Sequence, residues 1–378
     1  MKAVVYSRYG PPDVVQIDDV EKPVPQDNEV LIKVFAASVN PLDAGLMKGG
    51  GRLVTGLRKP KAGRLGVDVA GKVEAVGRNV TQFKPGDAVF GVCISDPQAS
   101  ALSVWIPQGA FAEYACAPES ALVMKPDIVT FEQAAAAPVA AFTALQGLRL
   151  GGLGNTGRIQ PGQKVLINGA AGGVGTFAVQ IAKSFGAEVT GVCSMWNVKV
   201  VRSIGADHVI DYNQENFTTS DQRYHLIFDC IGNHSLSACR RVLNPKGTYV
   251  MVGDRSGRGM FGILSRLVAA LVLSRFVGQK LVTFLARPKT EDLTIMRELM
   301  AAGKVKPVID RRYGLSEVSE AIRYLGEGHA RGKVVIALEC SPPAATIAVR
   351  PVAVLRQKPP TPLSFRSPLY RRQCRPSE

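Results

Sequence analysis

The sequence predicts an α/β fold with a β-rich first part and, after it, a doubly wound parallel sheet. The first of three observations is that short valine-rich runs, bounded by Gly, Pro, Asp or Asn, fill roughly the first 125 residues. The second is that strand-like and helix-like runs alternate from about residue 163 onward. The third is an alanine- and leucine-rich stretch over 131–150, which separates the two patterns. Alternation of this kind implies a parallel sheet wrapped by helices.

The β-rich part is defined by its strand-like runs and by the turns between them. We expect strands at Lys2–Tyr6, Glu29–Ala37, Val69–Val76 and Ala88–Val92. A turn at Lys84-Pro85-Gly86-Asp87 precedes the last of these strands. A helix is expected over Phe131–Leu150, with Pro138 as a kink or boundary inside it.

The alternating part contains the remaining predicted elements. Its expected strands are Gln163–Asn168, Glu188–Cys193, His208–Asp211, Leu226–Cys230 and Gly247–Val252. Its expected helices are Val174–Phe185, Val198–Ile204 and Ser235–Leu243, followed by an amphipathic helix at Thr290–Ala302. Strand character returns at Pro307–Tyr313 and Lys333–Leu338, which we interpret as the chain coming back to the first domain.

The domain boundaries follow from these changes of pattern. We expect a first domain over 1–128, completed by 307–339, and a second domain over 129–306. Eight of the 24 prolines lie in 341–378, where neither helical nor strand periodicity is visible. We therefore expect 340–378 to be a disordered tail rich in Pro and Arg.

Composition narrows the class of protein. Hydrophobic residues make up 46% and charged residues 20%, which is typical of a globular chain. The net charge is +15, and the last 38 residues contribute +6 of it, from seven Lys/Arg against one Glu. The rest of the chain lacks a clustered basic patch with aromatic residues. We therefore expect no binding of nucleic acid, but attraction of an anionic ligand.

Cysteine spacing and apolar runs bear on location. The seven cysteines show neither CxxC nor metal-knuckle spacing, which favours a reducing cytoplasm. The longest apolar stretch, Met260–Leu273, is interrupted by Arg266 and is too short for a transmembrane helix. Its part Phe261–Leu273 fits a substrate cleft, a dimer interface or a peripheral membrane contact, and core or interface is favoured.

The strongest motif is a glycine-rich turn between a predicted strand and a predicted helix. Its sequence is Lys164-Val-Leu-Ile-Asn-Gly-Ala-Ala-Gly-Gly-Val-Gly175. Glycines let the backbone approach a diphosphate, and the helix N-terminus supplies free N–H groups and the positive end of its dipole. The turn therefore predicts dinucleotide binding by Gly169, Ala170, Gly172, Gly173, Val174 and Gly175. A second glycine-rich run, Gly151–Gly157, has no strand before it and is interpreted as a surface loop.

The tip of the second strand of the alternating part distinguishes between the nicotinamide cofactors. An NAD site has an Asp or Glu there, which binds the ribose hydroxyls. This chain has Cys193-Ser194, and no carboxylate follows before Asp207. Ser194 and Lys199 favour a cofactor with a 2′-phosphate, which is NADPH. Lys199 and Arg202 also fit a solvated helix face.

Seven motifs in a fixed order resemble the zinc-free branch of the medium-chain dehydrogenase/reductase superfamily, the quinone oxidoreductase and enone reductase type. They are Ala36–Asp43, Gly66–Gly71, Pro85–Phe90, Gly109–Tyr114, the glycine-rich turn, Gly205–Tyr212 and Gly328–Val335. The resemblance covers roughly Met1 to Leu338. It implies a GroES-like catalytic domain, built from the N-terminal part and the final strands, with a Rossmann domain inserted. Substrate and nicotinamide would meet in the cleft between them.

Departures from the zinc-using relatives predict that no metal is bound. Those relatives have a cysteine in the first catalytic loop and a His-Glu pair further on, where this chain has Asn40 and Val67-Asp68. Their structural zinc needs four cysteines, and only Cys93 and Cys116 lie in that region. Trp196 stands where many NADPH-using relatives have a basic residue, which weakens the NADPH prediction without reversing it.

Two residues are expected to be catalytic. Without zinc, hydrogen bonds must polarise the substrate carbonyl, which suits quinones and conjugated enones. Asn40 would donate to the substrate oxygen, and Asp43 would order a water molecule or a ribose hydroxyl. Asn40 also fits a plain N-cap position before Pro41.

Further cofactor contacts follow from the resemblance and from strand ends. Family analogy places Thr143 near the nicotinamide. Tyr212 would cover the adenosine phosphate, or is an ordinary tyrosine at a strand end. Gly232 and Val252-Gly253 would bring backbone close to the cofactor. Lys333 would reach a phosphate or a ribose, or is exposed to solvent.

These observations predict an NADPH-dependent reductase of a quinone or an α,β-unsaturated carbonyl compound, a cytoplasmic homodimer that works without metal. Two alternatives stay open. One is an NADPH-binding partner or regulatory protein with little turnover, and the other is an enoyl-thioester reductase with a basic rim that binds the phosphates of its carrier.

Overall fold

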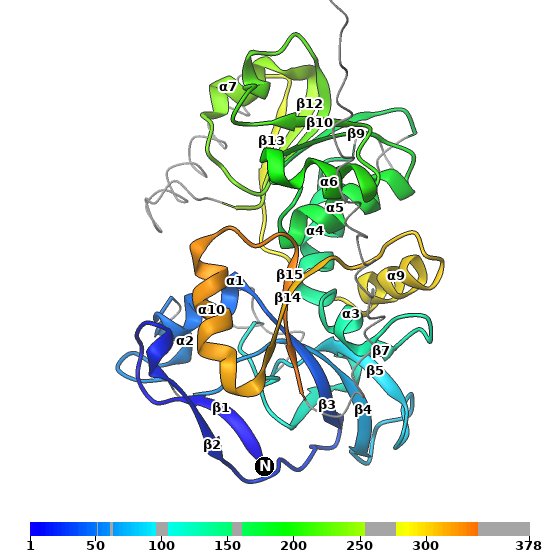
Figure 1. Ribbon diagram of the computed structural model, residues 1–378. Coiled ribbons are helices and arrows are strands. Elements are labelled where there is room, and N and C mark those ends of the chain that lie inside the picture. The colour runs from blue at the N-terminus through cyan, green and yellow to red at the C-terminus, as the bar shows by residue number, and fades with distance from the viewer. Residues whose placement is uncertain (51, 61–62, 96–104, 153–160, 254–276, 339–378) are drawn as a thin grey trace, which may run out of the picture. The chain divides into compact units, whose positions relative to one another are not determined.

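The computed structural model describes residues 1–50, 52–60, 63–95, 105–152, 161–253 and 277–338, all of which belong to one compact unit, Met1–Cys340 (Figure 1). The described strands form two large sheets and one separate pair, β1 (Lys2–Tyr6) with β2 (Val15–Asp19). The predictions for 261–273 and for the tail 340–378 lie outside the described residues, as does most of the glycine-rich run at 151–157. No helix within the described ranges is long and apolar enough to cross a membrane.

The first large sheet combines the N-terminal strands with two strands from the end of the described chain. Its order is β14-β15-β3-β4-β5-β7, and β6 pairs with β3. The strands are β3 (Glu29–Val39), β4 (Asp68–Val76), β5 (Ala88–Val92), β6 (Tyr114–Pro118), β7 (Leu122–Met124), β14 (Ile309–Gly314) and β15 (Lys333–Ala337). The predicted return of the chain to its first part is confirmed by the pairing of β15 with β3.

The second large sheet is parallel throughout, in the order β10-β9-β8-β11-β12-β13. Its strands are β8 (Lys164–Asn168), β9 (Glu188–Cys193), β10 (His208–Asp211), β11 (Tyr224–Asp229), β12 (Leu243–Met251) and β13 (Lys280–Thr283). Numbered from β8, this is the strand order 3-2-1-4-5-6 of a doubly wound dinucleotide-binding sheet. The order reverses between β8 and β11, so a ligand crevice is expected at their carboxyl ends.

The helices pack around these sheets. They are α1 (Pro41–Met47), α2 (Arg52–Thr55), α3 (Phe131–Ala135), α4 (Pro138–Leu150), α5 (Gly173–Ser184), α6 (Val198–Ser203), α7 (Leu236–Arg241), α9 (Thr290–Ala301) and α10 (Val318–Glu327). The short 3₁₀ helices are Pro12–Val14, Glu119–Ala121, Met195–Asn197, Phe217–Thr219 and Leu315–Glu317. Pro138 separates α3 from α4, as predicted, because proline is tolerated in the first turn of a helix but not in its interior.

The predicted elements agree with the observed ones to within a few residues, with several omissions. The short strands β2, β6, β7 and β13 and the helices α1, α2 and α10 are absent from the prediction. The sequence does contain a signal for α10. Val318, Ala321 and Ile322 are buried at helical spacing, and Gly328 ends the helix in a left-handed conformation with φ of 80°.

Alternation along the strands of the first sheet fills two cores. Neighbouring residues of a strand point to opposite faces, so Val89 of β5 and Phe90 enter different clusters. Phe90 joins Phe142 of α4 and Ile167 of β8 in one continuous core. Val89 lies on the other face, in the cluster that contains Ile322 of α10. The helix α4 therefore joins the two sheets through a shared apolar core.

A buried carboxylate ties three strands of the parallel sheet together. Asp229 ends β11, and its Oδ1 accepts hydrogen bonds from Nδ2 of Asn168 in β8 at 2.8 Å and from the backbone N–H groups of Ile231 and Gly232 at 2.9 and 2.8 Å. Its Oδ2 accepts from the Tyr249 hydroxyl of β12 at 2.7 Å. The carboxylate is completely buried. It therefore sets the turn after β11, at the edge where a ligand is expected.

We expect Asp229→Ala to lower the free energy of unfolding by about 2–4 kcal/mol, because the substitution leaves several buried donors without an acceptor. Urea denaturation followed by circular dichroism measures the change. Asp221→Ala, at an exposed position, is the matched control and should stay within about 0.5 kcal/mol of wild type. Equal losses in the two variants would contradict this role for Asp229.

Candidate functional site

A cavity of about 530 Å³ lies where the crevice of the parallel sheet meets the first sheet. One wall is the glycine-rich turn, with Gly169 and Gly172 to Gly175. Another comprises Asn40 and the start of α1, and a third is the segment that enters β15 and contains Lys333. The described residues that line it include two lysines, Lys48 and Lys333, and no Asp or Glu. Lys48 thus provides a positive charge that attracts an anionic ligand, whereas the charge of Lys333 is balanced by Asp68.

The geometry of the glycine-rich turn fits a diphosphate. Gly169 has φ of 85°, which favours glycine, and a Cβ at Gly175 would overlap the carbonyl oxygen of Gly169. A Cβ at Gly172, by contrast, would meet a single atom within 4 Å, the Gly169 oxygen, and would project into the cavity that Gly172 lines. The helix α5 begins at Gly173 beside this space. Its first N–H groups have no partner inside the helix and are free to bind an anion.

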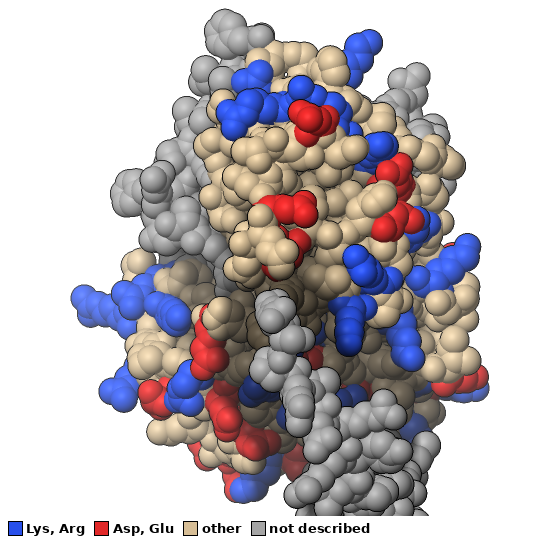
Figure 2. Space-filling view, turned by 45° about the horizontal axis from the view of Figure 1, so that its top comes forward, with Lys and Arg blue, Asp and Glu red and all other residues tan. Residues whose placement is uncertain are grey.

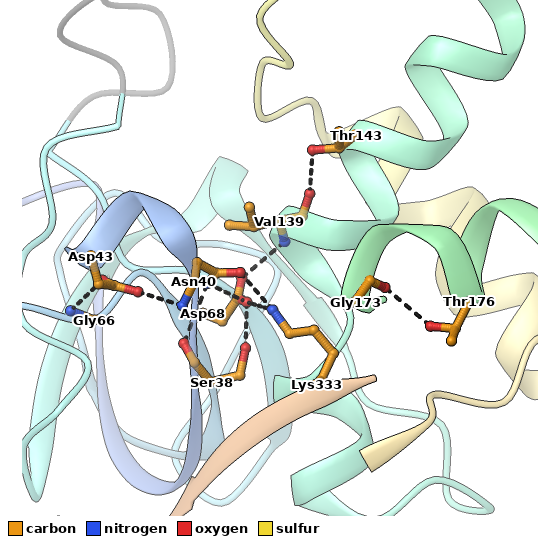
Figure 3. A network of polar contacts seen from close by, with 10 residues as sticks. All are labelled: Ser38, Asn40, Asp43, Gly66, Asp68, Val139, Thr143, Gly173, Thr176 and Lys333. Atoms are coloured by element: carbon orange, nitrogen blue, oxygen red, sulfur yellow. Dashed lines mark hydrogen bonds and ion pairs between the residues drawn. The ribbon is translucent and has the colours of Figure 1, made fainter. Parts of the chain in front are cut away.

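Opposite the turn lies a buried polar network that joins four elements (Figure 3). Oδ2 of Asp68 accepts hydrogen bonds from Ser38 Oγ at 2.5 Å and from Asn40 Nδ2 at 2.9 Å, and it lies 3.3 Å from Lys333 Nζ. Its Oδ1 accepts from the backbone N–H of Val139 in α4 at 2.9 Å. Nζ of Lys333 also donates to Asn40 Oδ1 at 2.5 Å. Of these four side chains, Lys333 is the most exposed, at 4%.

The strand register explains how this network assembles. Antiparallel pairing places Ser38 of β3 opposite Asp68 of β4. The pairing of β3 with β15 places Val39 opposite Val334, so Lys333 arrives beside Asn40. Gly332 precedes it with φ of 121°, and a Cβ there would overlap the Val308 carbonyl oxygen. Two strand pairs therefore bring together residues that lie 293 positions apart in the sequence.

Asn40 lines the cavity, as expected, but its side-chain amide already donates to groups of the protein. Its Nδ2 donates to Asp68 Oδ2 and, at 3.3 Å, to the carbonyl oxygen of Ser38. Both amide protons are therefore directed into the protein, and neither is left to donate to a substrate oxygen. Asn40 occupies the N-cap position of α1, yet its side chain makes no capping hydrogen bond. The alternative of an N-cap position before Pro41 is therefore confirmed for the residue, although its side-chain amide binds Asp68 and Ser38.

Asp43 does not have the expected position either. Its Oδ2 accepts from the backbone N–H of Asn40 at 2.8 Å and its Oδ1 from that of Gly66 at 3.0 Å. Asp43 is fully buried and is absent from the cavity lining. The carboxylate therefore fixes the loop before α1 and is not placed to order a water or a ribose hydroxyl in the cavity. Burial raises the pKa of Asp43 to about 7, against the lowering effect of the two backbone N–H groups.

The predicted cofactor residues divide into two groups. Gly169, Gly172, Gly173, Val174, Gly175, Gly253 and Lys333 line the cavity. Ala170, Thr143, Ser194, Lys199, Tyr212, Gly232 and Val252 do not. Thr143 lies within α4, and its hydroxyl donates to the Val139 carbonyl oxygen at 2.8 Å (Figure 3).

Several of the second group lie around the tip of β9. Oγ of Ser194 accepts from Asn197 Nδ2 at 3.0 Å, and Lys199 and Tyr212 are exposed to solvent. Burial raises the pKa of the Cys193 thiol to about 11, so this side chain is neutral and repels no phosphate. Trp196 is 73% exposed, which leaves a large apolar surface beside these polar groups.

Lys333 and its partners differ most from the expectation. The alternative that Lys333 is exposed to solvent is wrong, because its side chain is buried and paired with Asp68. Ser38 and Asp68 are absent from the predicted site. A signal for Asp68 was available, since a carboxylate inside the apolar run Val67–Ala70 must find buried partners. Ser38 offered none, because serine is common in strands that border loops.

On the face drawn in Figure 2, the described Lys and Arg side chains do not form a single patch. Figure 2 shows Lys and Arg side chains in several separate groups on one face, with Asp and Glu side chains between them. Among the described residues, no three His, Cys, Asp or Glu side chains are grouped so that they could hold a metal ion.

Two family models match separate parts of the chain. Residues 26–127 match the family model of the alcohol dehydrogenase GroES-like domain. Residues 204–336 match the model described as zinc-binding dehydrogenase.

Similar proteins cover nearly the same length. A chloroplast envelope quinone oxidoreductase homolog of Arabidopsis thaliana is 34% identical over 348 residues, which cover 89% of this chain and 98% of that protein. A chloroplastic NADPH-dependent alkenal/one oxidoreductase of the same plant is 33% identical and is covered to 79%. The structure of the quinone oxidoreductase from Coxiella burnetii matches with a TM-score of 0.75 at 29% identity, over 89% of this chain and 99% of that one.

The raised pKa of Asp43 predicts how stability depends on pH. Because the pKa of Asp43 in the folded state lies above its ordinary value of 3.8, the contribution of this group to stability is complete below about pH 4 and is lost as the pH rises to about 7. Asp43→Asn removes this titration. We therefore expect the free energy of unfolding to fall more steeply for wild type than for Asp43→Asn over this pH range.

Urea denaturation at several pH values measures both slopes, with Asp221→Asn as a control that should follow wild type. If the free energy of unfolding varied with pH in the same way for wild type and for Asp43→Asn, Asp43 would be ionised over the whole pH range.

Proposed function

The chain belongs to the medium-chain dehydrogenase/reductase superfamily, to its quinone oxidoreductase and enone reductase type, and we propose that it reduces a quinone or an α,β-unsaturated carbonyl compound with NADPH. The observation that carries this proposal is the cavity that places the glycine-rich turn opposite the Asn40–Asp68–Lys333 network. A dinucleotide site and buried polar groups thus border the same space, as hydride transfer to a carbonyl compound requires.

The residues of the chain have separable tasks in this proposal. NADPH, when bound along the glycine-rich turn, supplies the hydride. Gly172 and Gly173 keep the turn free of side chains, and the first N–H groups of α5 bind the diphosphate. Asp68 and Asn40 hold the ammonium group of Lys333 at the cavity wall. The apolar lining, which includes Val39, Ala140 and Ile231, excludes water from the reacting carbon.

The proposed preference for NADPH rests on the tip of β9. No carboxylate is present at Cys193-Ser194, so a 2′-phosphate meets no negative charge from the strand end. Exposed Lys199 lies one turn further on, in α6, and is free to approach a phosphate.

We also propose that the reaction needs no zinc, because this chain has Asn40 and Val67-Asp68 where zinc-using relatives have a cysteine and a His-Glu pair. We also propose two domains, because the strands divide into two large sheets. The first comprises 1–128 and 307–339, and the second comprises 129–306. A homodimer and a cytoplasmic location are proposals as well, the second favoured by free thiols at the five described cysteines.

A screen of NADPH oxidation tests the function. Purified protein is offered quinones, conjugated enones and enoyl thioesters, with and without a chelator, and its zinc content is measured. We expect turnover of quinones or enones that survives chelation, without stoichiometric zinc. If only enoyl thioesters were turned over, the protein would be an enoyl-thioester reductase and not a reductase of quinones or enones. Tight NADPH binding without any turnover would instead indicate a partner or regulatory protein.

Cofactor preference is the second test. One well-formed phosphate contact from Lys199 is worth about 1.5–3 kcal/mol. We therefore expect kcat/KM to favour NADPH over NADH by about tenfold to a hundredfold. Lys199→Ala should reduce this ratio, mainly by weakening NADPH, whereas Lys84→Ala in a distant turn should not. The measurements need constant ionic strength, since salt screens phosphate contacts. A ratio of one or less in wild type would overturn the assignment, with Trp196 as the first residue to examine.

A further inference from the structure

The ammonium group of Lys333 has more donors than the protein around it uses. A lysine side chain offers three N–H donors. Within the described structure, Nζ of Lys333 meets two acceptors, Asn40 Oδ1 at 2.5 Å and Asp68 Oδ2 at 3.3 Å. Lys333 is buried, yet it lines the cavity. One N–H donor therefore remains for a group inside the cavity.

The neighbouring Asn40 amide has no N–H group left to donate to a ligand in the cavity. Both protons of Asn40 Nδ2 are bound by Asp68 and by the Ser38 carbonyl oxygen. The Asn40 oxygen is occupied as well, by Lys333. Figure 3 shows the long Lys333 side chain reaching from its strand to this pair, on the side of the network that faces Gly173. Of the side chains in the network, Lys333 alone has a hydrogen-bond donor left over.

We propose that Lys333 is the catalytic hydrogen-bond donor to the carbonyl oxygen of the substrate, and that Asp68 and Asn40 are its positioning residues. This inference rests on the proposed reduction of an enone or quinone. It replaces the donor that the sequence predicts, Asn40, by a residue from the other end of the chain.

The chemistry of the step follows from this placement. In an enone, a hydride forms a new C–H bond at the β-carbon while the C=C π pair shifts and the C=O π pair moves onto oxygen. The oxygen becomes an enolate oxyanion, and the Lys333 N–H bond stabilises that charge as it develops. A proton from solvent then adds to the α-carbon and gives the saturated ketone. The cofactor leaves oxidised, with two electrons transferred, so atoms and charges balance.

The pairing with Asp68 favours a carbonyl oxygen over a cofactor phosphate at this place. The carboxylate lies 3.3 Å from Nζ and balances the lysine charge. A diphosphate brings its full negative charge against Asp68 at all times. A carbonyl oxygen is neutral in the ground state and gains charge in the transition state, so the interaction strengthens where it accelerates the reaction.

The variants that test this are Lys333→Met, which removes the donor, and Lys333→Arg, which keeps a cation. Lys333→Met alone leaves Asp68 buried without its partner, so Lys333→Met combined with Asp68→Asn removes both charges together. Lys84→Met, in an exposed turn, controls for the loss of one lysine elsewhere. Each variant is made in the full chain, and its melting temperature is recorded.

Two readouts separate the roles. Turnover of the enone should fall about 10²–10³-fold in Lys333→Met, in the range for one lost oxyanion donor. The NADPH dissociation constant, from fluorescence titration, should change less than about threefold. The second readout needs no turnover. The dye 4-(dimethylamino)cinnamaldehyde, bound to the complex with NADP⁺, should absorb at longer wavelength than in water when its carbonyl oxygen accepts the lysine N–H. That red shift should vanish in Lys333→Met and in the double variant, and return in part in Lys333→Arg.

The outcomes that overturn the proposal are distinct from failure of the proposed function. An NADPH dissociation constant that rises as much as kcat/KM falls would make Lys333 a ligand of the cofactor. An unchanged red shift in Lys333→Met, or no shift in wild type, would exclude contact with the carbonyl oxygen. If wild type reduces no enone or quinone, the proposed function fails, and the dye spectrum alone still decides whether Lys333 contacts a carbonyl oxygen.

Discussion

The buried carboxylate of Asp68 is the constraint on which the candidate site depends. A carboxylate without solvent must be matched by donors, and here the donors come from β3, α4 and β15 and from Asn40 at the start of α1. Removing any one of these elements would leave a buried charge or donor unpaired. These hydrogen bonds to Asp68 connect the paired strands with α4. They also determine where the Asn40 amide and the Lys333 ammonium group lie. Structure and site therefore share one set of hydrogen bonds.

A second buried carboxylate, that of Asp229, connects the strands of the parallel sheet in the same way as Asp68 connects those of the first sheet. Asp229 links β8, β11 and β12 and sets the turn after β11, whose residues Cys230 and Ile231 line the cavity. The glycine-rich turn lies between these two carboxylate networks. Its conformation needs glycine at Gly169 for a positive φ and at Gly175 for close packing of backbone. Buried hydrogen bonds thus hold the cavity walls on both sides, which suits a reaction whose rate depends on the positions of two bound molecules.

Most elements of the fold could be predicted because the pattern of the chain is local. Valine-rich runs, the helix after Pro138 and the alternating strands and helices appear close to their expected bounds. Short strands such as β7 and β13 were not predicted, because three or four residues show too little periodicity to distinguish a strand from a loop. The glycine-rich turn was equally predictable, since it is one continuous segment.

The sequence by itself determined the family, the doubly wound sheet and the glycine-rich turn, because each depends on residues that are neighbours along the chain. Only the tertiary structure decided which polar side chains share a buried space. Asn40 was expected to donate to a ligand, but the register of β3 against β4 directs its amide to Asp68. Lys333 was equally compatible with solvent until the pairing of β15 with β3 placed it in that network. The physical reason is that a hydrogen-bond partner is chosen by strand register, and register between distant strands depends on how the whole sheet packs.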